Sequence, residues 1–288
     1  MTSNPHFALL EDRGLLAVSG NDAREFLQGL ISNDIHKAGP GAAIYAALLT
    51  PQGKYLHDFF IVEKEGALLL DCERARLDDL KKRLGMYKLR ADVALEDRSD
   101  DFAIVVFFGE GSEIAGIGFP DPRLKDIGGR AILPKADAED MMTSIGCRPA
   151  GLDEYDALRL SLGLPDGSRD LVIEKSILLE SGFDELNGID WDKGCYMGQE
   201  LTARTKYRGL VKKRLVPVIF NGAAPPPATP VMMGEKEAGE MRSSVTTDNG
   251  GIGLALLRLE NLEDVKDGDD LKAGEVSLTP QKPAWMAN

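Results

Sequence analysis

Between residues 43 and 108, short apolar stretches alternate with turn signals around one amphipathic helix. The pattern predicts a helix at 73–84 and five strands, at 43–49, 55–62, 67–70, 91–95 and 102–108. Residues 50–54 (Thr-Pro-Gln-Gly-Lys) separate the first two strands and are typical of a hairpin turn. This order of elements predicts an α+β fold in which the strands pair mainly antiparallel.

A strand and a helix are expected before this region. Residues 14–18 are apolar and predict the strand, and Ser19 together with Asp22 is expected to cap the helix that follows. Apolar side chains recur at helical spacing from Ala23 to Ile31. The helix is expected to end near residues 32–34, because Ser, Asn and Asp favour turns.

The pattern changes in the second half of the chain. Residues 109–140 are rich in Gly and Pro and are expected to form a loop or a domain boundary. Residues 151–162 predict an amphipathic helix. Beyond residue 213, short apolar runs predict a small all-β module with strands at 215–220, 231–233, 252–257 and 276–278.

The net charge of −13 bears on the partners of this chain. An acidic chain is poorly suited to coat nucleic acid or to anchor itself on an anionic membrane. The apolar run from Phe102 to Phe108 is also far too short to span a bilayer. We therefore expect neither a nucleic acid nor a membrane as partner.

The cysteines and histidines bear on metal binding and on location. Cys72, Cys147 and Cys195 are widely spaced and form no Cys-x-x-Cys pair, and the three histidines form no His-x-x-x-His pair. We therefore expect no stably bound metal. Three free thiols, and an N-terminus without an apolar or Arg-rich leader, predict a protein of the reducing cytoplasm.

The segment from Lys193 to Arg204 contains a thiol, a carboxylate, an amide, two cations and two glycines within twelve residues. If a helix begins near Gly198, its free N–H groups would face an anion or a thiolate. Lys193 and Arg204 would add positive potential beside Cys195, which could then act as nucleophile, metal ligand or redox sensor. The alternative is a buried cysteine that serves only packing, which is the commoner fate of a single thiol.

Positive charge is concentrated around this segment. Residues 193–214 carry seven cations and one acid, a local charge of +6 that leaves −19 on the rest of the chain. Around residues 212–214 we favour a solvated basic strand edge. For Lys193, Arg204 and Arg208 an anionic ligand is an equally good interpretation.

The run Lys-Gly-Cys-Tyr-Met-Gly-Gln-Glu at 193–200 resembles the K-G-C-Y-x-G-Q-E motif of the folate-binding YgfZ family. The likeness continues through residues 26–34, 50–54, 121–123 and 159–165. This family includes a mitochondrial branch of iron–sulfur assembly factors and is related in fold to the glycine cleavage T-protein, an aminomethyltransferase.

The resemblance implies a three-domain ring around a channel that binds tetrahydrofolate. Residues 1–42 and 145–210 would form a discontinuous first α+β domain that carries the motif. Residues 43–144 would form the middle α+β domain, and residues 211–288 a C-terminal β-barrel.

The resemblance also implies the residues of the site. Cys195 would be the key thiol, with Lys193 beside it in a catalytic role. The residues expected to contact tetrahydrofolate are Asn33, Asp34, Asp58, Arg90, Arg159, Tyr196, Gln199, Glu200 and Arg204.

Two departures separate the chain from the aminomethyltransferases. The T-protein has an Asp-Asp pair where this chain has His57-Asp58, and it has a glutamate where this chain has Ser161. The missing acids argue against aminomethyl transfer but not against folate binding, for which Asp58, Arg90 and the backbone remain available.

The expected function is therefore to assist maturation or repair of [4Fe–4S] proteins, with iron–sulfur client or scaffold proteins as partners and no conventional turnover. The alternatives are a folate-dependent one-carbon transferase and a binding module whose cysteine is incidental. A cysteine hydrolase ranks last, because no histidine lies near Cys195 in the sequence.

Overall fold

The structure, a computed structural model, describes residues 4–112, 117–248, 250–264 and 270–286. It forms two compact units. The first contains residues 1–52, 56–152 and 186–199, and the second contains residues 53–55, 153–185 and 200–288. Helices and mainly antiparallel sheets make up the chain, which confirms the predicted α+β class.

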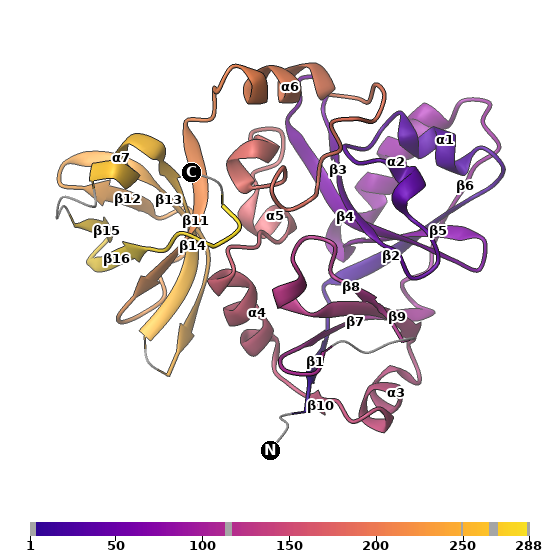
Figure 1. Ribbon diagram of the computed structural model, residues 1–288, viewed down its shortest axis with the longest axis horizontal. Coiled ribbons are helices and arrows are strands. Elements are labelled where there is room, and N and C mark those ends of the chain that lie inside the picture. The colour runs from indigo at the N-terminus through magenta and orange to yellow at the C-terminus, as the bar shows by residue number, and fades with distance from the viewer. Residues whose placement is uncertain (1–3, 113–116, 249, 265–269, 287–288) are drawn as a thin grey trace. The chain divides into compact units, whose positions relative to one another are not determined.

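One five-stranded sheet of the first unit has the order β3-β4-β5-β2-β6 (Figure 1). Its strands are β2 (Arg13–Ser19), β3 (Ile44–Leu49), β4 (Tyr55–Lys64), β5 (Ala67–Glu73) and β6 (Ala94–Asp97). β2 pairs antiparallel with both β5 and β6. The expected domain boundary between residues 42 and 43 therefore separates strands that share one sheet.

Three-turn helix α2 (Leu77–Lys88) contributes Leu77, Leu80 and Leu84 to the core of this sheet, as their helical spacing predicts. It follows the 3₁₀ turn η2 (Arg74–Arg76), so it begins four residues later than expected. Helix α1 (Ala23–Gln28) and the 3₁₀ turn η1 (Ile35–Lys37) lie before β3.

The predicted cap of α1 is wrong. Ser19 is the last residue of β2, and Asp22 occupies the N-cap position without a side-chain capping bond. The Asp22 carboxylate instead accepts a hydrogen bond from the backbone N–H of Asp92 at 2.7 Å. A tertiary contact has taken the acceptor that a capping box would use.

The second sheet of the first unit has the order β10-β1-β7-β9-β8. Its strands are β1 (His6–Leu9), β7 (Phe102–Phe108), β8 (Phe119–Pro120), β9 (Gly129–Pro134) and β10 (Arg148–Pro149). The region expected as loop thus contains β8, η3 (Lys125–Ile127), β9 and helix α3 (Ala138–Ser144). An apolar cluster that includes Leu15, Leu69, Ile104 and Ile132 packs the two sheets together.

The second unit contains a closed barrel of six strands in the order β11-β14-β13-β12-β15-β16, which confirms the predicted β module. The strands are β11 (Lys213–Phe220), β12 (Pro230–Met233), β13 (Lys236–Thr247), β14 (Gly250–Arg258), β15 (Leu271–Ala273) and β16 (Val276–Pro280). The helical elements are α4 (Leu152–Ser161), α5 (Gly167–Asp170), η4 (Leu178–Ser181), α6 (Gln199–Tyr207) and α7 (Leu259–Asp264).

Candidate functional site

The motif segment lies against the turn that follows α1. The backbone N–H of Asp190 donates to the carbonyl of Ser32 at 3.0 Å, and the N–H of Met197 donates to the carbonyl of Gly29 at 3.2 Å. The Ser32 hydroxyl donates to the carbonyl of Gly188 at 2.6 Å. Two segments more than 150 residues apart in sequence are thereby joined on both sides of Cys195.

Lys193 is the centre of this attachment. Its buried ammonium donates to the carbonyl oxygens of Gln28, Ile31 and Asn33 at 2.8, 2.6 and 2.8 Å. All three ammonium protons thus have carbonyl acceptors in the last residue of α1 and in the turn that follows it. Burial lowers the pKa of Lys193 to about 8, while Asp34 and Asp190 oppose that shift.

Asn33 braces the same turn from the other side. Its amide donates to the carbonyls of Tyr45 and Asn187 at 2.7 and 2.8 Å. Its amide oxygen accepts the N–H of Asp34 at 2.8 Å. Asp34 in turn accepts the N–H of His36 and the amide of Gln28, both at 3.0 Å. Both predicted residues therefore serve the turn itself.

Asp190 is a site residue that the sequence analysis missed. One carboxylate oxygen accepts the N–H groups of Asp192 and Lys193 at 2.8 and 3.1 Å, and the other pairs with Lys37 at 2.5 Å. Burial alone would raise the pKa of Asp190, but the hydrogen bond from Lys37 and those from the backbone hold it below its usual value. The Asp-Trp-Asp-Lys spacing is typical of an Asx turn and was the available signal.

The cysteines divide into one exposed and two buried thiols. Cys195 is exposed, whereas Cys72 and Cys147 are buried. Burial raises the pKa of Cys72 to about 12, and burial also raises that of Cys147. Both buried thiols are thereby kept protonated and packed, so Cys195 is the reachable one.

The helix expected near Gly198 is confirmed. Gly198 has a φ of 84°, a conformation that glycine adopts without strain, and α6 begins at the next residue. Tyr196 is buried, and its ring lies 5.0 Å from the Lys193 ammonium. The side chain of Gln199 is half-buried.

Three of the seven cations of residues 193–214 form ion pairs within the chain. Arg204 pairs with Glu200 at 2.6 Å across one turn of α6, Lys206 pairs with Asp184 at 3.0 Å, and Arg214 pairs with Glu185. The acids at 184 and 185 precede the counted segment, so counting charge by sequence overstated the local excess.

Arg159 belongs to the second unit and braces it internally. The buried guanidinium donates to the Asp170 carboxylate at 2.8 Å, to the Leu164 carbonyl at 3.0 Å and to the Ser243 hydroxyl at 2.8 Å. These bonds tie α4 and α5 to barrel strand β13. Arg90 lies exposed after the end of α2, and its folate contact stays a prediction.

Asp58 is a buried carboxylate on β4. It accepts the Tyr45 hydroxyl at 2.8 Å, and the Tyr45 and Phe60 rings lie 5.0 Å apart beside it. Burial and the adjacent Asp58 raise the pKa of Tyr45 well above its usual value, so it remains a donor. A buried acceptor next to aromatic rings is a chemistry that fits the N–H groups of a pterin.

The neighbouring His57 contacts helix α2. Its ring nitrogen Nε2 lies 2.9 Å from the Asp79 carboxylate of α2. Burial and Arg76 lower its pKa to about 4, although Asp79 opposes this. His57 is therefore neutral near pH 7.

A buried ionic network joins the two sheets of the first unit. Asp71 on β5 accepts Arg13 of β2 at 2.7 Å and Arg130 of β9 at 2.6 Å. Arg123 pairs with Asp121 at 2.8 Å. All three guanidinium groups lie within 6 Å of the Phe60 ring, Arg130 nearest at 4.0 Å. The network lies next to Asp58 through Tyr45, whose ring Arg123 also covers at 5.4 Å.

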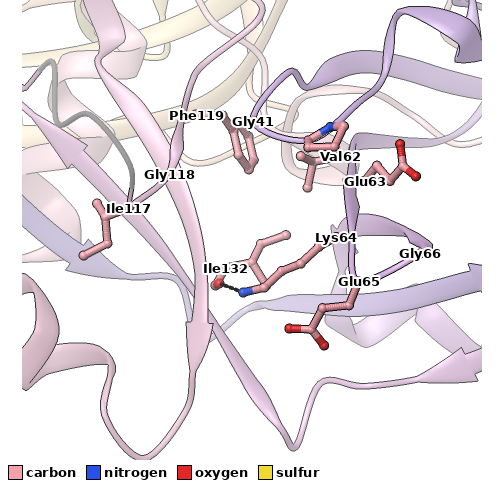
Figure 2. A pocket seen from close by; sticks show the side chains of 11 residues that line it. Gly41, Val62, Glu63, Lys64, Glu65, Gly66, Ile117, Gly118, Phe119 and Ile132 are labelled. Carbon is pink, nitrogen blue, oxygen red and sulfur yellow. Dashed lines mark hydrogen bonds between the residues drawn. The ribbon is translucent and has the colours of Figure 1, made fainter.

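A pocket in the first unit lies between the β4–β5 hairpin and strands β8 and β9 (Figure 2). Its volume is about 370 Å³. The Lys64 side chain extends to the carbonyl of Ile132, to which it donates at 3.0 Å. Glu63 pairs with Arg24 at 2.7 Å. None of the predicted site residues lines this cavity.

Across the described ranges, no group of three or more His, Cys, Asp or Glu side chains is placed to hold a metal ion. In the same part of the chain, no helix has the length and apolar character needed to cross a membrane.

Comparison with known proteins gives matches over both units. Residues 11–113 match the family model of the GCVT N-terminal domain, and residues 212–288 match the CAF17 C-terminal beta-barrel domain. The aminomethyltransferase T of the glycine cleavage system from Bartonella henselae aligns with a TM-score of 0.75 at 16% identity, over 99% of this chain and 87% of that one. The expected T-protein-like fold is thus confirmed.

Curated relatives carry the name iron–sulfur cluster assembly factor IBA57, mitochondrial, or a homologue of it. The Mus musculus protein is 32% identical over 96% of this chain and 84% of its own length. The Mycosarcoma maydis homologue is 37% identical over 77% of this chain. The chain spans 59% of that relative and 54% of the one from Neurospora crassa.

These names correct the predicted location. Relatives from fungi and mammals are named mitochondrial, so the expectation of a cytoplasmic protein is wrong. Free thiols indicate a reducing environment but do not identify the compartment. With 32% identity across most of both chains, and with matches to both family models, this chain belongs to the CAF17/IBA57 family of iron–sulfur cluster assembly factors.

Proposed function

We propose that this chain assists the maturation or repair of [4Fe–4S] proteins, and that Cys195 is the thiol through which it does so. The observation that carries the proposal is an exposed thiol on a segment held by buried bonds on both sides. The family relationship supports the iron–sulfur role. Since cysteine ligation of such a cluster normally needs several thiolates, Cys195 would share the contact with a client or scaffold protein.

Lys193 takes a positioning role in this proposal. Its three donors are occupied by backbone carbonyls, so it holds the segment that presents Cys195. Asn33 and Asp190 hold the same segment from either side.

The finer proposal is that a reduced folate, as tetrahydrofolate, assists this role. Asp58 is the residue of the first unit that fits it best, because its buried carboxylate lies beside the Tyr45 and Phe60 rings. Asn33 and Asp34 would frame the folate site indirectly, since their side chains bind within the turn. A bound tetrahydrofolate would supply one-carbon or reducing chemistry at this place.

The test of the iron–sulfur role uses cells in which the variant is the only copy of the chain. Cys195→Ala should lower the activities of cluster-dependent enzymes under oxidative stress, while Cys147→Ala should leave them near normal. Unchanged activities in the Cys195→Ala cells would refute the role of this thiol.

The folate proposal has a separate test. Calorimetric titration with tetrahydrofolate should show binding that Asp58→Asn weakens about tenfold, the usual range for losing a charged acceptor. Equal affinity of both proteins, or no heat at all, would refute it.

The alternative is a folate-dependent aminomethyltransferase, which the shared fold favours. The side chains at positions 57 and 161, where the T-protein has acids, argue against it. His57 is held by Asp79, and the Ser161 hydroxyl donates to the carbonyl of Leu158 in its own helix at 2.7 Å. Turnover of an aminomethylated donor with tetrahydrofolate would establish this alternative.

A further inference from the structure

The surface next to Cys195 combines bare backbone with exposed apolar side chains. Met197, two residues beyond Cys195, accepts a hydrogen bond from the Tyr87 hydroxyl on its sulfur at 3.1 Å. Its N–H also donates to Gly29. The end of α2 and the turn after α1 therefore both contact the thiol segment at Met197.

Gly29 and Gly194 are not required by the fold. Both are exposed, and neither has a positive φ. A Cβ added at either position would meet nothing within 4 Å. The backbone at both positions is therefore open to close approach by another molecule.

The end of α2 adds apolar and basic side chains. Met86 is 60% exposed and Tyr87 is 42% exposed. Lys82 is exposed one turn before Met86, on the same face of the helix. Residues 81–90 contain five cations and no acid, of which Lys82 and Arg90 are exposed and Arg83 pairs with Asp79 at 2.7 Å.

We propose that these residues form one docking surface for a protein partner that presents an acidic rim around an apolar groove. The surface, which we call the thiol-loop surface, consists of Gly29, Lys82, Met86, Tyr87 and Gly194. The proposal rests on the proposed function, because it places the partner of Cys195. Met86 is the apolar anchor, and Lys82 supplies the charge that steers an acidic protein here while the acidic remainder of the chain repels it.

The variants that test the surface leave Cys195 in place. Met86→Asp and Lys82→Glu should each lower the activities of cluster-dependent enzymes about tenfold in cells that contain only the variant, the usual effect of losing an anchor or reversing a rim charge. Lys82→Gln should have a smaller effect than Lys82→Glu, because it removes a charge without introducing repulsion.

The glycines provide a sharper comparison. Gly29→Ala should lower the same activities while keeping or raising the thermal midpoint of the purified chain, since α-region backbone favours alanine. Gly39→Ala is the matched control, because a Cβ there also meets nothing within 4 Å and Gly39 lies outside the surface. The rate at which N-ethylmaleimide alkylates Cys195 should be unchanged in all these variants.

The outcomes separate this proposal from the proposed function. Wild-type activity in Met86→Asp and Lys82→Glu, with Cys195→Ala inactive, overturns the surface alone. Wild-type activity in Cys195→Ala overturns the proposed function. Self-association of the purified chain that Met86→Asp abolishes, or binding to anionic lipid vesicles that it abolishes, assigns the surface to another occupant and overturns the proposal.

Discussion

At the scale of single residues, the segment that carries Cys195 is held by the hydrogen bonds of three buried polar side chains. Lys193 and Asn33 donate to backbone carbonyls of segments distant in sequence, whereas Asp190 accepts two nearby backbone N–H groups and pairs with Lys37. The motif predicted a functional role for Lys193, but not that its ammonium would donate hydrogen bonds to three backbone carbonyls. That geometry depends on the end of α1, which lies more than 160 residues earlier in the chain.

Lys193→Met should destabilise the chain by about 2–4 kcal/mol, because three buried carbonyls lose their charged donor. Urea unfolding measures this loss. Lys212→Met, at an exposed position, should stay within about 0.5 kcal/mol of wild type. Equal midpoints for both variants would contradict the assigned role of Lys193.

His57 should make stability depend on pH. Its folded pKa of about 4 lies below the usual 6.5, so the stabilisation is complete above pH 6.5 and is lost as the pH falls toward 4. Between these two pKa values, His57 is protonated in the unfolded chain and neutral in the folded chain. Between pH 7 and pH 4, wild type should lose about 2–3 kcal/mol relative to His57→Gln. A stability difference that does not change with pH would show that His57 titrates normally.

At the scale of elements, alternation and helical spacing predicted β3, β4, β7, α2 and α4 close to their observed positions. The start of α6 after Gly198 was also predictable, because glycine permits the turn before it. β9 was missed because glycine and proline surround it, and β13 because its buried Ala238 and Met241 are three residues apart, which breaks the alternation typical of a strand. The folate contact of Arg159 stays a prediction, and its buried guanidinium holds α4 to the barrel.

The two sheets of the first unit should depend strongly on Asp71. Asp71→Asn leaves Arg13 and Arg130 buried without their shared counter-charge and should cost about 3–5 kcal/mol. Asp100→Asn removes an exposed pair with Arg74 and should cost less than about 1 kcal/mol. Urea unfolding of the two variants side by side checks this, and equal losses would contradict the buried network.

At the scale of the whole molecule, the fold of an aminomethyltransferase carries a segment that presents one thiol. The eight-residue motif anticipated the fold and an iron–sulfur assembly family, but it named the related YgfZ family, whereas the relatives are named IBA57 and mitochondrial. The net positive charge around residues 193–214 is smaller than the sequence count gave, because Asp184 and Glu185 pair with Lys206 and Arg214. On α2, which that count did not cover, Lys82 is exposed.

The central claim is that the braced segment acts through Cys195. A double-mutant cycle tests it most directly, with cluster-dependent enzyme activity per folded chain measured for Lys193→Met, Cys195→Ala and the double variant. The account predicts that the double variant is no worse than Cys195→Ala alone, since Lys193 acts only by placing that thiol. A double variant whose loss is the product of the two single losses would contradict it.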